Sequence, residues 1–169
     1  MDDCVQRVIV GVDGSVGSLR ALRRGLAEAR LRGSVLYAVL AWTPPGGEIA
    51  DRRSPSAHLR PLWERSAWER LQKACGDALG GFPPDVKIRL LVARGTPRRA
   101  LAALADHETD LLVVGAGRRN PVRRVFAGSV ARYCAAHACC PVLVVPPSPL
   151  PRRMGRSTDN PERNNHVEA

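Results

Sequence analysis

Short apolar runs of strand length alternate with segments of helical periodicity along almost the whole chain. The runs expected to form strands are residues 7–12, 34–42, 86–93, 111–114 and 141–145. Between the first two, apolar residues recur at spacings of three and four, at Leu19, Leu22, Leu26 and Ala29. Gly33 then stands where a helix C-cap belongs. This alternation predicts a parallel sheet with right-handed crossovers and helices on both faces.

Three further helical segments are expected. They cover residues 61–79, residues 96–107 with Thr96 as N-cap and Pro97 at the first helical position, and residues 129–137. Residues 43–55 concentrate proline, glycine and charge, so we expect a mobile surface loop that can act as a lid. The fold class expected is α/β, a three-layer sandwich of the Rossmann-like or flavodoxin-like type, with five parallel strands in the order 3-2-1-4-5.

The chain of 169 residues carries a net charge of +10, and nearly all of its 26 basic residues are arginines. A basic balance favours nucleic acid, anionic ligands or acidic partners. The arginines are spread over every expected segment, which indicates a solvated basic surface. Aromatic residues for base stacking make up only 4% of the chain, so a nucleic-acid partner is disfavoured. Nucleic-acid binding nevertheless stays open as an alternative function.

The start of the chain lacks the basic and apolar regions of a signal peptide, and its longest apolar run, residues 35–42, is far below the about 20 residues that span a bilayer. We therefore expect a soluble, cytoplasmic protein with no membrane partner. Its five cysteines should then be thiols, mostly small buried residues. Cys134, Cys139 and Cys140 lie close to His137 in the sequence, which suggests a metal site. Adjacent side chains such as Cys139 and Cys140 tend to point apart, so we expect no metal.

Two turns are candidates for ligand binding because each follows an expected strand. The fourth strand breaks into Gly115-Ala116-Gly117, where backbone amides can approach a ligand, and Ser129 stands where the next helix is expected to start. Asp13 follows the first strand; its turn can bind a ribose or base, or can simply cap the first helix. Ligands of such sheets bind at the carboxyl ends of strands where the order reverses. We expect Asp13 and Gly115 to share that crevice, with Ser129 on the phosphates.

Residues 7–146 resemble the universal stress proteins, in VIVGVDGS at the first strand, GTPRRALAALADHETDLLVVG before the glycines and GSVARYCAAHACCPVLVV at the end. The family motif is glycine, two residues, glycine, nine residues, then glycine with Ser or Thr, and Gly115, Gly128 and Ser129 match it. The resemblance implies an adenine-nucleotide site, with ATP and its Mg²⁺ as ligand. Its residues would be Asp13, Ala41, Val114, Gly115, Gly128, Ser129 and Val130. It also implies a homodimer through the last strand.

Arg118 stands where the family motif has its second glycine. An arginine side chain there can block the approach of the main chain to phosphate. Alternatively, Gly117 takes over the backbone role and the Arg118 guanidinium pairs with phosphate. The sequence leaves both possibilities open.

The sequence thus predicts a domain over residues 1–146 and a disordered basic tail over residues 147–169. The function expected is a dimeric, ATP-binding regulatory module of the stress response; the alternative from the same fold is an interaction protein whose nucleotide site Arg118 has closed. No catalytic residues are expected, although slow incidental ATP hydrolysis stays possible. A dinucleotide-dependent oxidoreductase is disfavoured because Asn120 replaces the third glycine of that fingerprint.

Overall fold

The computed structural model describes residues 7–55, 57–116 and 124–146. Its strands are β1 (Arg7–Gly11), β2 (Val35–Trp42), β3 (Ile88–Arg94), β4 (Leu111–Gly115) and β5 (Val142–Val145). All four pairings between them are parallel, and the order across the sheet is β3-β2-β1-β4-β5. The expected fold class and strand order are confirmed. The reversal of order lies between β1 and β4.

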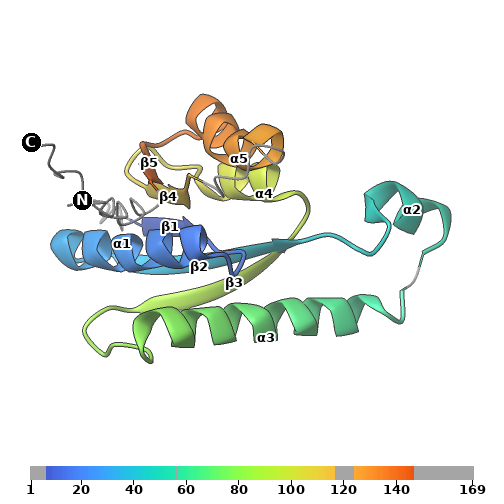
Figure 1. Ribbon diagram of the computed structural model, residues 1–169, viewed down its shortest axis with the longest axis horizontal. Helices are drawn as coiled ribbons and strands as arrows, with labels where there is room; N and C mark the ends of the chain where they lie inside the picture. Colours follow the sequence, from blue (N-terminus) through green and yellow to red (C-terminus); the bar gives the residue numbers. More distant parts are fainter. Residues whose placement is uncertain (1–6, 56, 117–123, 147–169) are drawn as a thin grey trace, which may run out of the picture.

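Helices cover both faces of this sheet, which makes three layers (Figure 1). On one face lie α1 (Val16–Arg32) and α3 (Arg60–Leu79), and on the other lie α4 (Pro97–Leu104) and α5 (Arg124–His137). The short helix α2 (Gly47–Arg53) stands in the connection from β2 to α3 and projects beyond the layers. Within the described part of the chain, no helix combines the length and apolar character that crossing a bilayer requires.

Alternate residues of the central strands supply two apolar cores. Val8 and Val10 face α1 and α3, where they pack with Leu22 and Leu71. The opposite face of the sheet packs against α4 and α5. There the strand residues Ile9, Val39 and Leu112 pack with Leu101 of α4 and Cys134 of α5. Burial on both faces explains why these strands read as continuous apolar runs, since neither face meets water.

Helices α1 and α3 end as expected, at glycines whose backbone is in the left-handed region. Gly33 has φ of 59° and Gly80 has φ of 68°, values that L side chains rarely adopt. Thr96 occupies the N-cap of α4 with Pro97 first in the helix, as expected, although the Thr96 side chain makes no capping hydrogen bond.

The structure corrects three expectations about helices. Residues 43–55 are not an irregular loop, since they contain α2. Helix α4 ends at Leu104 and not near His107, because a turn with a hydrogen bond from Asp110 N to His107 O (3.0 Å) takes over there. Helix α5 begins at Arg124, five residues before the expected start at Ser129.

The described cysteines are free thiols. Cys75 and Cys134 are buried, and burial raises the pKa of each to about 11. Cys139 is exposed, contrary to the expectation of burial, because it follows α5 in an exposed turn. No group of three metal-ligating side chains comes together among the described residues. The tail from residue 147 onward lies outside the described residues.

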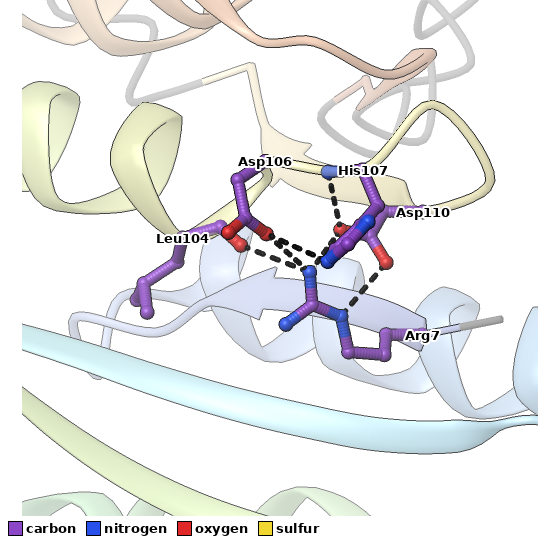
Figure 2. A network of polar contacts seen from close by, with 5 residues as sticks. All are labelled: Arg7, Leu104, Asp106, His107 and Asp110. Carbon is purple, nitrogen blue, oxygen red and sulfur yellow. Dashed lines mark hydrogen bonds and ion pairs between the residues drawn. The ribbon is translucent and has the colours of Figure 1, made fainter. Parts of the chain in front are cut away.

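A charged cluster fixes the amino edge of the sheet, where β1 and β4 begin (Figure 2). The Arg7 guanidinium donates to both carboxylate oxygens of Asp110, at 2.8 and 2.5 Å, and to Asp106 at 2.5 Å. The Asp110 carboxylate is fully buried and also accepts a hydrogen bond from His107 N. Hydrogen bonding to Asp110 raises the pKa of Arg7, and Arg7 holds the pKa of Asp106 below its usual range. This bidentate pair joins two core strands far apart in sequence.

Two glycines allow α1 to lie very close to the sheet. A Cβ at Gly25 would collide with the Val10 side chain. A Cβ at Gly115, the last residue of β4, would lie 2.7 Å from the carbonyl oxygen of Gly17 and 3.3 Å from Ser18 N. The end of β4 therefore touches the backbone of the first turn of α1, and only the lack of a side chain at Gly115 permits this contact.

Replacing Asp110 by Asn should destabilise the fold, because the Arg7 guanidinium would lose its buried countercharge. We expect a loss of about 2 kcal/mol, below the usual cost of breaking a buried pair because Arg7 is partly exposed and keeps Asp106. Urea denaturation at neutral pH measures it. The matched control is Asp85→Asn, which removes an exposed pair with Arg30 and should change stability little. Equal losses in the two variants would contradict this role of burial.

Gly115→Ala should also destabilise the protein, by about 1–3 kcal/mol, because the added methyl group meets rigid backbone at Gly17. Gly76→Ala is the control: Gly76 lies inside α3 with open space around it, so alanine should be neutral or stabilise by about 0.5–1 kcal/mol. Thermal and urea unfolding of both variants test the contact. A Gly115→Ala protein as stable as the parent would show that β4 and α1 are not tightly packed.

Candidate functional site

The turn after β1 and the end of β4 meet at the carboxyl edge of the sheet, at the reversal of strand order. The evidence is the contact of Gly115 with the backbone of Gly17 and Ser18, the residues that open α1 directly after that turn. The expectation that Asp13 and Gly115 belong to one region of this edge agrees with that contact. Ligands of doubly wound sheets bind at such a point because two loops diverge from it.

Asp13 presents an exposed carboxylate at this edge. Its Oδ1 accepts a hydrogen bond from Ser15 N (2.9 Å), and Asp13 N donates to Ser18 Oγ (3.2 Å). Partial desolvation of the carboxylate within the turn raises the pKa of Asp13, but hydrogen bonds from Ser15 and Ser18 outweigh this effect and leave that pKa below its usual value. The carboxylate is therefore ionised at neutral pH, and an ionised carboxylate can only accept hydrogen bonds.

The same turn caps α1, as the simpler interpretation of the sequence predicted. Ser15 is the N-cap, its Oγ accepts from Ser18 N at 3.2 Å, and Gly14 supplies the left-handed residue with φ of 80°. The side chain that caps α1 and the side chain expected to contact a ligand are different ones. The cap uses the Ser15 hydroxyl, whereas the Asp13 carboxylate stays accessible to solvent.

Ala41 lies next to the last residue of β2 and is partly buried. It pairs in register with Ala93 of β3, and Gly95 N donates to Trp42 O (2.8 Å) where the two strands end. The backbone of Ala41 is thus at the same carboxyl edge as Asp13, two strands from β4. Ala41 was expected near the end of the second strand, and it lies there.

The residues expected around the glycine motif fall into three groups. Val114 is 3% exposed and Val130 is partly buried; both pack in the core between the sheet and α4 with α5. Gly128 and Ser129 lie in the second turn of α5, since that helix begins at Arg124. Gly117 and Arg118 lie outside the described residues.

The amide of Ala116 is engaged in the sheet. Ala116 N donates to Val145 O at 2.9 Å, so β5 extends its pairing past the last residue of β4. This amide is therefore not free for a phosphate group. Main-chain donors of a phosphate cradle would have to follow Ala116 in the chain.

A charged cluster that the sequence did not predict also lies at this edge. Glu48 and Asp51 of α2 pair with Arg94, the last residue of β3, and Asp51 also pairs with Arg60 at the start of α3. The pairs span up to 46 residues, and no local pattern marks them. The only available signal was the density of charge in residues 43–55, which we interpreted as a mobile surface loop.

The chain resembles known proteins over most of its length. The model of the Universal stress protein family matches residues 5–146. A universal stress protein of Mycolicibacterium smegmatis is 32% identical over 143 residues, which cover 83% of this chain and 45% of that relative. The chain thus spans about half the length of this relative. A universal stress protein of Thermus aquaticus, named for the QAH/OAS sulfhydrylase 3′ region, is 30% identical over 141 residues, which cover 82% of this chain and 96% of that relative.

Solved structures agree with these relatives. A universal stress protein crystallised in complex with cAMP is 30% identical, with a TM-score of 0.51, and the match covers 83% of this chain and 95% of that one. The family model, the relatives and the strand order all apply to the same domain. The chain belongs to the universal stress protein family.

Proposed function

We propose that this chain is a regulatory module that binds an adenine nucleotide at the carboxyl edge of its sheet. The observation behind the proposal is the contact of the β4 end with Gly17 and Ser18 in the first turn of α1. That turn directly follows the ionised, exposed Asp13, whose backbone N donates to Ser18 Oγ. Asp13 would accept hydrogen bonds from the ribose, and Ala41 would line the base with its backbone. The solved relative that holds cAMP supports an adenine nucleotide as the ligand class.

ATP with its Mg²⁺ is the nucleotide we propose. Gly117 or Arg118, with Gly128 and Ser129, would contact its phosphates, since the amide of Ala116 is taken by β5. If Arg118 pairs with phosphate, the additional charge of a triphosphate favours ATP over a nucleotide with a single phosphate. Nucleotide occupancy would then change contacts with partners of the stress response.

We propose a binding role without catalysis. The Asp13 carboxylate is the only acidic group that the sequence places in the two candidate turns, and its lowered pKa makes it a weak base at neutral pH. Any hydrolysis of ATP would be slow and incidental.

The module would work as a homodimer through β5. In the described sheet, β5 is an edge strand that pairs with β4 on one side. Its residue Val144 is 41% exposed, and apolar edge strands favour pairing with a second chain.

Asp13→Asn is the sharpest test of nucleotide binding. The Asn side-chain oxygen can still accept from Ser15 N, so the cap of α1 should persist, but the charged acceptor is lost. We expect the Kd for ATP to rise about tenfold or more, the value of a hydrogen bond to a charged group. Isothermal titration of the nucleotide-stripped protein measures it, with Asp85→Asn as control. Equal affinity in Asp13→Asn and the parent would remove Asp13 from the site.

Arg118→Gly distinguishes an open site from a closed one. If Arg118 pairs with phosphate, the glycine variant should bind ATP more weakly than the parent protein. If Arg118 fills the site, the parent should bind no ATP and the variant should gain binding. The second result would establish the alternative function, a universal stress protein that interacts with partners without nucleotide.

A further inference from the structure

Helix α2 is attached to the rest of the protein by charge and hardly by apolar packing. Its one buried residue is the carboxylate Asp51, whereas Ile49 is 70% exposed and Arg52 and Arg53 face solvent. Figure 1 shows the helix standing away from the layers at the end of a long connection from β2. A seven-residue helix is too short to be stable alone, so its contacts elsewhere must determine its position.

Those contacts converge on two arginines at the carboxyl edge. The Arg94 guanidinium donates to both oxygens of Glu48, at 3.0 and 2.8 Å, and to Asp51 Oδ2 at 2.7 Å. Arg60 donates to the same Asp51 oxygen at 2.7 Å. One side of the cluster belongs to the rigid sheet and to α3, and the other side belongs to α2. Hydrogen bonding by Arg94 holds the pKa of Glu48 below its usual range.

Part of this charged cluster is open to solvent, and part of it is imperfectly satisfied. The Arg94 and Glu48 side chains are each about a third exposed, so water and salt weaken their attraction. Among the described residues, Arg60 Nε is buried without a hydrogen-bond partner, which costs free energy in the closed state. Gly46, the N-cap of α2, and Gly47, its first residue, have φ of 82° and 83° and permit a change of backbone direction.

We propose that residues 46–54 form an electrostatic strap at the carboxyl edge of the sheet, closed by Arg94 and Arg60 on Glu48 and Asp51, which opens locally without global unfolding. Its opening controls the entry and exit of the nucleotide. The part of the proposal that concerns ligand access rests on the proposed function, because β2 connects Ala41 to the strap directly. Closure of the strap itself does not depend on nucleotide.

Hydrogen exchange of the full chain without nucleotide tests the strap. At low salt, Arg94→Met should raise exchange in residues 46–54 about tenfold, because the charged contacts of Glu48 are lost. In the parent protein, raising NaCl from about 20 mM to about 1 M should speed the same amides several-fold. Arg94→Met should weaken that salt dependence and leave only the part due to the Arg60–Asp51 pair. Arg94→Lys should restore part of the protection. Trypsin cleavage after Arg52 or Arg53 should follow the same order.

The matched control is Arg30→Met, which breaks an Arg–Asp pair on α1 and should leave the strap unchanged. Strap amides that exchange equally in Arg94→Met and the parent would overturn the proposal, as would an equal effect of Arg30→Met. Circular dichroism verifies that each variant is folded. If Arg94→Met does not fold, Arg94→Lys replaces it in the comparison with the parent protein.

A second arm tests ligand access by stopped-flow kinetics with ATP. Arg94→Met should raise the association and dissociation rates together, with little change in Kd, because a gate alters rates in both directions. The gating role is overturned if the amides of the strap exchange faster in Arg94→Met while its ATP association and dissociation rates stay unchanged. If the parent protein binds no nucleotide, the proposed function fails, while the exchange experiment still decides whether the strap exists.

Discussion

The contact between the last residue of β4 and the first turn of α1 is the constraint on which the carboxyl edge depends. Gly115 meets the backbone of Gly17 directly, so the helix cannot move away from the strand without opening the core. A glycine in the motif therefore has a packing role before any ligand is considered. Its position also brings the two diverging loops together, which is the geometric requirement for a ligand site at the reversal of strand order.

In the turn of residues 13–15, the groups that cap α1 differ from the carboxylate that we propose for binding. Backbone groups at the start of α1 are satisfied by the Ser15 and Ser18 hydroxyls, and Ser15 N uses one oxygen of Asp13. A ligand that approaches the exposed carboxylate does not have to break the cap. For this reason, a charge-removing substitution at Asp13 reports on binding, whereas a substitution at Gly115 reports first on packing.

Sequence periodicity predicted the fold because its signals are local. Continuous apolar runs mark strands covered on both faces, and Gly33 and Gly80 mark helix ends through the conformation they adopt. The start of α5 and the helix α2 were missed for different reasons. Glycine and serine at 128 and 129 resemble a helix start although the helix already began at Arg124. Helix α2 depends on Arg94, 46 residues from Glu48, and no local pattern encodes such a pair.

The two arginine clusters show that the same chemistry has different consequences at the two edges of the sheet. At the amino edge, Arg7 joins residues at the starts of two central strands, so breaking the pair disturbs the core. At the carboxyl edge, Arg94 holds a helix with a single buried residue, so breaking the pair releases only that helix. The carboxyl edge therefore combines a rigid contact at Gly115 with a weakly attached helix α2. Movement of α2 would not involve the core, as the proposed strap requires.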